Sequence, residues 1–180
     1  KTAATGKTVT TTGFSLSGAD AANYSLTQPT YLAANITQKS LSVSATTNSA
    51  NKIYDSSRTA QVSLSSSDIV GSDSLSINYT TASFDTKNVG NNKAVTIGGI
   101  NITGTDSNNY LLQNTSTTTT ANITQKALTI SGVTAANKVY DASTAATLSG
   151  GVLTNGAASS TDNKYYTGDA VTLNTTTAGT

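Results

Sequence analysis

The 180-residue chain contains no cysteine, histidine, methionine or tryptophan, and a single proline. Without cysteine it forms no disulfide and offers no thiolate, and without histidine it lacks the side chain most used in proton transfer and zinc binding. Its nine acidic residues stand singly among turn-forming residues rather than in clusters. We therefore expect no enzyme activity, no cofactor and no metal site.

Charge and long apolar runs are also scarce. Charged residues make up 11% of the chain and the net charge is +1, so the sequence carries no electrostatic footprint for nucleic acid or an anionic membrane surface. No apolar run approaches the roughly 20 residues that a membrane helix needs. We expect neither nucleic-acid binding nor membrane insertion.

Threonine, serine and asparagine fill the places that charged and apolar residues leave. A cysteine-free chain of this composition is more typical of a bacterial exported protein than of a disulfide-bonded eukaryotic ectodomain. The sequence shows no signal peptide and opens in the middle of a repeated pattern, so we expect it to belong to a longer protein. The predicted location is extracellular, at the bacterial cell surface.

The chain is dominated by an internal repeat. Three motifs occur twice, 86 or 87 residues apart: Ala-Asn-Ile-Thr-Gln-Lys at 34–39 and 121–126, Asn-Lys-Ile/Val-Tyr-Asp at 51–55 and 137–141, and Gly-x-Asp-x-x-Asn-Tyr at 18–24 and 104–110. Lys1 corresponds to Lys87. Asp73 corresponds to Asp169, where extra residues in 150–168 predict a longer surface loop. The chain therefore contains tandem copies of one module.

The phase of apolar alternation locates the module boundary. Ala34 and Ile36 are even-numbered whereas Leu41 and Val43 are odd-numbered, and the same inversion recurs at Gln125-Lys126. Such an inversion without glycine or proline indicates an extended segment that leaves one core and enters the next. This predicts a nearly linkerless, stiff joint. The predicted divisions are the C-terminal part of one module (1–39), a complete module (40–126) and the N-terminal part of the next (127–180); a boundary at Lys1, giving two whole units, is the alternative.

Short β-branched or alternating runs separated by turn residues predict an all-β fold. About seven strands per module favour an immunoglobulin-like antiparallel β-sandwich. Apolar phase also inverts at Gly13 and at Gly98-Gly99, which predicts a β-bulge or a strand that changes sheet. Asn155-Gly156 predicts a tight hairpin turn.

Two motifs supply the candidate structural residues. The aspartate and tyrosine of Gly-x-Asp-x-x-Asn-Tyr resemble a tyrosine corner, and one carboxylate per loop is too few for calcium. In Lys-Ile/Val-Tyr-Asp, we expect the tyrosine to bury its ring and the aspartate to cap the following turn. These residues are Asp20, Tyr24, Asp106, Tyr110, Tyr54, Asp55, Tyr140 and Asp141.

Taken together, these motifs and Lys87-Asn-Val-Gly90 resemble the YDG/MBG-type bacterial immunoglobulin-like modules, and the resemblance spans essentially the whole chain. It implies tandem arrays in large, secreted, filamentous-haemagglutinin-like surface proteins, a spacing or adhesive role, and no enzyme activity. The family's glycine after Tyr-Asp is replaced by Ser56 and Ala142 here. A turn that needs a positive φ is energetically less favourable with these residues than with glycine.

Three functions follow as hypotheses. The first is a structural stalk or spacer of an adhesin or matrix protein, whose partners are the neighbouring modules of the same chain. The second is direct binding of a host or matrix glycan, or of a protein, through loop 150–168, where Tyr165 and Tyr166 offer adjacent rings for stacking. The third is head-to-tail assembly of identical chains into a filament, in which 1–39 of one chain completes 127–180 of its neighbour.

Overall fold

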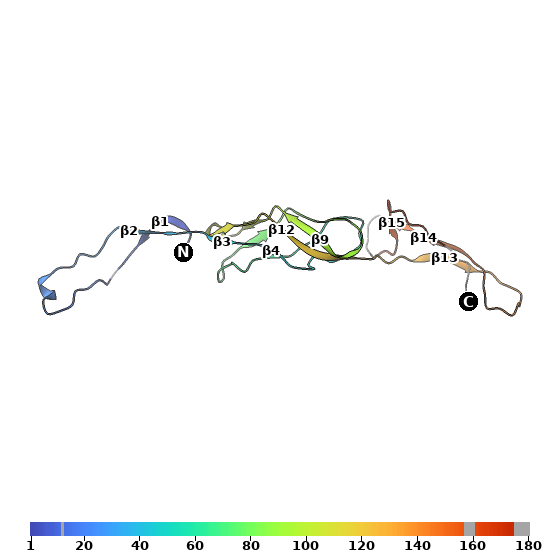
Figure 1. Cartoon of the computed structure of the whole chain (residues 1–180), viewed down its shortest axis with the longest axis horizontal. Coiled ribbons are helices and arrows are strands. Elements are labelled where there is room, and N and C mark those ends of the chain that lie inside the picture. The colour runs from blue at the N-terminus through green and yellow to red at the C-terminus, as the bar shows by residue number, and fades with distance from the viewer. Residues whose placement is uncertain (12, 157–160, 175–180) are drawn as a thin grey trace. The chain divides into compact units, whose positions relative to one another are not determined.

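The computed structural model describes residues 1–11, 13–156 and 161–174, and it is all-β, as the sequence predicts. The helical elements within these residues are two single-turn 3-10 helices, η1 (Ala21–Asn23) and η2 (Ser107–Asn109). The chain divides into two compact units, and Figure 1 labels several of their strands. Unit 1 comprises Lys1–Ser44, Leu64–Tyr79 and Gly99–Thr115, and unit 2 comprises Ala45–Ser63, Thr80–Gly98 and Ser116–Thr180. The boundaries proposed at Lys39 and Lys126 stay a prediction.

Unit 1 is built from short two-stranded ladders. β1 pairs with β2 and β7 pairs with β10, both antiparallel, whereas β3 pairs with β11 in parallel. Its strands are β1 (Ala4–Val9), β2 (Leu32–Ile36), β3 (Lys39–Leu41), β6 (Leu64–Ser65), β7 (Ser76–Asn78), β10 (Asn101–Thr103) and β11 (Tyr110–Leu112). β4 (Ser44–Ala45) begins at the last residue of this unit's first segment.

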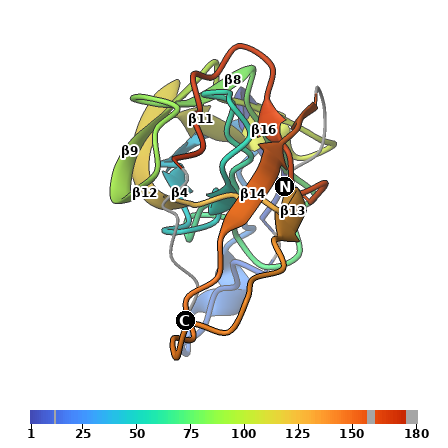
Figure 2. The same ribbon diagram turned by 90° about the vertical axis from the view of Figure 1, so that its right-hand side faces the viewer.

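Unit 2 contains the largest sheet, with strand order β5-β12-β9-β8. Its long strand β12 is a run of threonines ending in Ala-Asn-Ile-Thr, and such β-branched residues favour the pleated conformation. β13 and β14 form a separate antiparallel ladder and lie side by side in Figures 1 and 2. The strands are β5 (Lys52–Ile53), β8 (Thr81–Phe84), β9 (Gly90–Gly98), β12 (Ser116–Thr124), β13 (Ile130–Ala135), β14 (Leu148–Leu153), β15 (Asn155–Gly156) and β16 (Tyr165–Tyr166).

The strands are not all antiparallel. β3 with β11, β5 with β12 and β15 with β16 are parallel pairs. In the first two pairs the partners lie about 70 residues apart in the sequence, so no hairpin connects them. The expectation of purely antiparallel strand pairing was therefore wrong. Motif and alternation patterns identify strands, but they do not reveal which distant strand each one pairs with.

Two glycine-centred expectations have opposite outcomes. The inversion at Gly98-Gly99 is a change of sheet, because β9 ends at Gly98 and the next strand, β10, belongs to a different ladder. The hairpin predicted at Asn155-Gly156 is wrong. These two residues form β15 in extended backbone, and a β-carbon on Gly156 would lie 2.7 Å from the Asp162 carboxylate. The glycine therefore permits a close approach and not a turn.

The repeat reappears in the backbone. β1 and β2 pair in the register of β9 and β12: Lys7 with Ala34 matches Lys93 with Ala121, and an irregularity follows each pair towards the shared Asn-Ile. At this bulge the Asn35 side-chain oxygen accepts the Gly6 N–H at 2.8 Å, as Asn122 does from Asn92. The same short ladder therefore forms in both copies.

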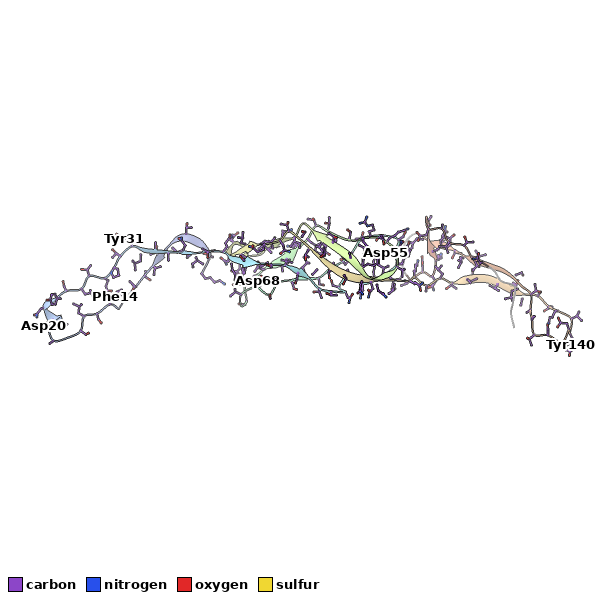
Figure 3. All side chains as sticks on the ribbon, in the orientation of Figure 1. Phe14, Asp20, Tyr31, Asp55, Asp68 and Tyr140 are labelled. Atoms are coloured by element: carbon purple, nitrogen blue, oxygen red, sulfur yellow. The ribbon has the colours of Figure 1, made fainter. Side chains whose placement is uncertain are left out.

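The apolar core lies within one copy of the repeat. Apart from Tyr166, the buried apolar residues of the described chain lie between Leu41 and Ile123, inside residues 40–126, which we call the complete repeat. The largest fully buried side chains are Leu41, Phe84, Val95, Ile97 and Ile123. In the N-terminal segment, by contrast, Phe14 and Tyr31 project from the ribbon and are largely exposed (Figure 3).

Candidate functional site

The Lys-Ile/Val-Tyr-Asp motif forms a turn closed by its own side chains. The Asp55 carboxylate accepts the Ser57 N–H at 2.9 Å and the Ser57 hydroxyl at 3.0 Å, and it pairs with the Lys52 ammonium at 2.7 Å. The ammonium also donates to the carbonyls of Ser57 and Thr59. The lysine and aspartate thus hold the turn from both sides, and neither is left available for chemistry.

The second copy of the motif folds in the same way. Asp141 accepts the Ser143 N–H at 3.0 Å and pairs with Lys138 at 2.7 Å. Tyr140, however, is almost fully exposed. Figure 3 labels it on the loop that contains this turn. The turn therefore forms from local sequence alone, without a covering layer.

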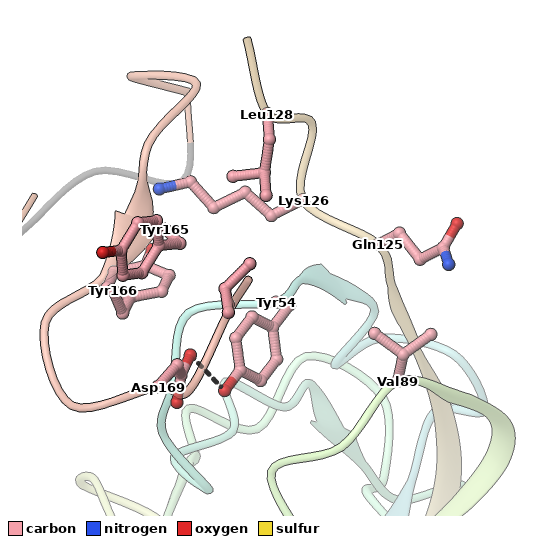
Figure 4. A pocket seen from close by; sticks show the side chains of 9 residues that line it. Tyr54, Val89, Gln125, Lys126, Leu128, Tyr165, Tyr166 and Asp169 are labelled. Atoms are coloured by element: carbon pink, nitrogen blue, oxygen red, sulfur yellow. Dashed lines mark hydrogen bonds between the residues drawn. The ribbon is translucent and has the colours of Figure 1, made fainter. Parts of the chain in front are cut away.

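Tyr54, in the first copy of the motif, belongs to a cluster of side chains that joins two copies of the repeat within unit 2. Its hydroxyl donates to Asp169 at 2.7 Å (Figure 4). The same carboxylate pairs with Lys87 at 2.6 Å. The Tyr54 ring meets the Tyr166 ring edge-on, with centroids 5.9 Å apart. We call Tyr54, Lys87, Tyr166 and Asp169 the Asp169 cluster.

A second ion pair lies beside this cluster. Lys126, the last residue of Ala-Asn-Ile-Thr-Gln-Lys, is 4% exposed and pairs with Asp162 at 2.6 Å. Its ammonium lies 4.2 Å from the centre of the Tyr166 ring, in a cation–π contact. The residue at the predicted module boundary is therefore held by a charge and a ring from the following copy.

Unit 1 contains the equivalent lysine–aspartate pair, with a tyrosine from a different motif. Asp73, the counterpart of Asp169, pairs with Lys1 at 2.6 Å and accepts the Tyr110 hydroxyl at 2.9 Å. The turn is also the same, because the Asp73 N–H donates to the Val70 carbonyl at 3.1 Å and the Asp169 N–H donates to its counterpart at 3.0 Å. We call Lys1, Asp73 and Tyr110 the Asp73 cluster. One lysine–aspartate pair thus occurs twice, once at each joint between copies.

Both carboxylates are stabilised in their charged form. The Lys87 ammonium, followed by the Tyr54 hydroxyl, lowers the pKa of Asp169, and the Lys1 ammonium does the same for the pKa of Asp73. The ion pairs in turn raise the pKa of Lys87 and of Lys1. The two clusters are therefore electrostatic links at neutral pH.

These shifts predict that the joints loosen in acid. An aspartate whose pKa is lowered by folding contributes stability above its unfolded pKa, about 3.9, and loses that contribution as the pH falls further, through the lowered value. The lysine contribution is lost only in strong alkali, as the pH rises through its raised pKa. The protection of amides 165–170 against hydrogen exchange, relative to an unstructured chain at the same pH, is expected to fall below about pH 4. In Asp169→Asn this fall should be absent, because the protection of these amides is already low at neutral pH.

The tyrosine-corner residues have longer-range partners than expected. The Tyr110 hydroxyl accepts the Val70 N–H at 2.8 Å, from a residue 40 positions upstream rather than a few. Asp106 accepts the Ser74 N–H at 2.9 Å. Asp20 and Tyr24 adopt nearly the same backbone angles around η1 as Asp106 and Tyr110 do around η2, and neither helix has a side-chain cap bond. Tyr24, however, is exposed whereas Tyr110 is buried.

A cleft of about 390 Å³ opens beside the Asp169 cluster and is lined by Tyr54, Lys126, Leu128, Tyr165 and Tyr166, among others (Figure 4). Tyr165 is partly exposed, whereas Tyr166 is 7% exposed and packs against Tyr54. The two rings are thus not a pair of exposed stacking surfaces. Residues 157–160 of the predicted loop 150–168 lie outside the described residues, and glycan binding there stays a prediction.

The comparison with protein families matches the YDG domain over residues 1–31, 37–120 and 124–180. The chain belongs to the YDG domain family. No curated protein and no solved structure matches it. In this YDG chain the residues after Tyr-Asp, Ser56 and Ala142, have φ of 62° and 59°. Both copies therefore form the left-handed turn that glycine prefers, although the residue at this position is not glycine in either copy.

The described residues of the YDG chain contain no group of three or more acidic, histidine or cysteine side chains placed to hold a metal ion. Within the same residues, no helix has the length and apolar character to cross a membrane. The best-ordered polar arrangements among the described residues of this YDG chain are thus the Asp73 cluster and the Asp169 cluster, one at each joint between copies. Neither Asp73 nor Asp169 was a predicted site residue, although both aspartates and their lysines recur in the repeat alignment.

Proposed function

We propose that the chain is a structural stalk or spacer segment of a bacterial cell-surface or extracellular-matrix adhesin, built from tandem immunoglobulin-like sandwich modules. Its partners are the neighbouring modules of its own chain. The observation that carries this proposal is the recurrence of the lysine–aspartate pair at 2.6 Å in both joint clusters. In a chain of many modules, the repeated residues would form the same ion pair between each module and the next.

The short connection between copies supports the same function. At the first joint β2 ends at Ile36 and β3 begins at Lys39, so two residues separate the strands; at the second, five residues lie between the end of β12 at Thr124 and the start of β13 at Ile130. Gln38 also donates to the carbonyls of Asn108 and Tyr110, at 3.0 and 3.2 Å. A connection of this length, fixed by hydrogen bonds, leaves little freedom for one copy to swing against the next.

The double variant Lys87→Met/Asp169→Asn tests the joint. It removes the ion pair without leaving an unpaired charge, so the overall fold should persist while the joint becomes freer. Distances between spin labels at the exposed residues Thr96 and Val152, measured by pulsed electron resonance, are expected to spread from one narrow distribution into a broad one. The control, Lys93→Met/Asp85→Asn, removes a 2.8 Å pair inside one copy and should leave the distribution narrow. A broad distribution in the unmodified chain would contradict a stiff spacer.

A further inference from the structure

The first and the last strand of the complete repeat both lie in parallel pairs. β3, the first strand, pairs with β11, and β12, the last strand, pairs with β5. The preceding copy connects to the start of β3 at Lys39, and the following copy connects to the end of β12 at Thr124. We call β3 with β11 the entry pair and β5 with β12 the exit pair.

The entry pair, in unit 1, is extended by further hydrogen bonds. Past its ladder, the Gln113 N–H donates to the Leu41 carbonyl at 2.9 Å. The Asn114 side chain then bonds both polar groups of one residue, because its oxygen accepts the Val43 N–H at 2.9 Å and its amide donates to the Val43 carbonyl at 3.0 Å. The strand that receives the chain is therefore bonded to the same partner from Lys39 to Val43.

The exit pair, in unit 2, is held in a similar way. The Tyr54 N–H donates to the Thr124 carbonyl at 2.9 Å, and the Asn51 side-chain oxygen accepts the Asn122 N–H at 2.7 Å. On its other side β12 pairs with β9 along nearly its whole length. The strand that leads out of the repeat therefore cannot leave the sheet without breaking bonds along both of its edges.

Tension along the chain loads both pairs in shear. In the entry pair, β3 is drawn towards its N-terminal end, whereas β11 leads through 113–115 to β12 and is drawn towards its C-terminal end. In the exit pair, β12 is drawn towards its C-terminal end, and β5, which follows β3 and β4, is drawn towards its N-terminal end. Because parallel strands point the same way, the partners are pulled in opposite directions along their length, and their evenly spaced bonds share the load. An antiparallel hairpin pulled at its two open ends loses its bonds one at a time instead.

We propose that the complete repeat is a mechanical clamp, which keeps its fold under tension applied along the chain. Each pair links the two ends of the repeat by its own route, so the repeat lengthens only after both pairs have sheared. The inference rests on the proposed stalk function for its use, because a stalk that is anchored at one end and attached at the other is under tension. It goes beyond that function in assigning the load to two named strand pairs.

Single-molecule force spectroscopy of the full chain tests the clamp, and a chain without cysteine accepts handles at chosen residues. Thr37→Cys/Ala127→Cys, at two exposed residues, places the handles for pulling along the chain. Thr81→Cys/Ser116→Cys places them on either side of Gly98, at one end of the ladders of β8, β9 and β12, where force opens the bonds one by one. The unfolding force at one loading rate is expected to be severalfold higher along the chain than across the sheet, because forced unfolding measures the barrier to unfolding. Equal forces, or a higher force across the sheet, would overturn the proposal.

Two asparagine variants separate the clamp from overall stability. Asn51→Ala removes the side-chain bond to Asn122 in the exit pair, and it should lower the force along the chain but not the force across the sheet. The control, Asn78→Ala, removes side-chain bonds to Asn101 and Thr103 between β7 and β10, outside both pairs, and should change neither force. If Asn51→Ala lowered both forces equally, its bond would serve general stability and the clamp would be contradicted.

The outcomes also distinguish the clamp from the stalk. Equal forces in the two directions, together with a narrow spin-label distribution, would remove the clamp and leave the stalk. A higher force along the chain, together with a broad spin-label distribution, would support the clamp and remove the stiff spacer.

Discussion

Phe84→Ala is expected to lower the free energy of unfolding of the complete repeat by about 3–5 kcal/mol. Phe84 is fully buried and pairs with Val95 across the ladder of β8 and β9. Its backbone exchanges hydrogen bonds with Arg58, and the Lys52 ammonium lies 5.3 Å from its ring centre. Truncation removes the largest of the fully buried side chains and leaves a cavity that these fixed neighbours cannot fill. Urea unfolding followed by circular dichroism measures the loss.

The chain provides a matched control, because it contains only two phenylalanines. Phe14 is 59% exposed, so Phe14→Ala is expected to change the free energy of unfolding by no more than about 0.5 kcal/mol. An equal loss in both variants would show that the core is not centred in the complete repeat.

Local turns were predictable from the sequence because their contacts lie within a few residues. Lys52, Asp55 and Ser57 make the same bonds as Lys138, Asp141 and Ser143, although only the first set lies in a complete repeat. The all-β class followed from composition and alternation for a similar reason, since both are properties of short windows.

The joint clusters were not predictable in the same way. Lys1 is 72 residues from Asp73 and Lys87 is 82 residues from Asp169. No periodicity connects residues so far apart, and the parallel pairing of β3 with β11 was missed for the same reason. The signal that could have found them was recurrence, because both members of each pair keep their identity from one copy to the next.

Burial was the least predictable property. Tyr24 and Tyr110 stand in the same motif with nearly the same backbone, yet one is exposed and the other is buried. Their environments differ because residues 40–84 complete the second copy, whereas nothing in the described chain plays that part for the first. A motif therefore specifies local geometry, and the rest of the module decides what that geometry contacts.

Gly104→Ala is expected to destabilise the complete repeat by about 3 kcal/mol or more. Gly104 has φ of +121°, which strains any residue with a β-carbon, and that carbon would also collide with the Ser74 carbonyl. The carbonyl cannot yield easily, because the backbone of Ser74 is fixed by its hydrogen bond to the Asp106 carboxylate. The sequence marks Gly104 only as one of two equivalent glycines.

Two control variants separate strain from collision. Gly71→Ala, at φ of +56° with open space around it, should cost only about 1 kcal/mol, because the backbone strain acts without a clash. Gly18→Ala, in the equivalent motif, should leave the unfolding of the complete repeat unchanged, since no atom opposes the new methyl group. If all three alanine variants cost the same, φ strain alone would account for the glycine. A loss confined to Gly104 means that the motif requires glycine because another strand passes against it.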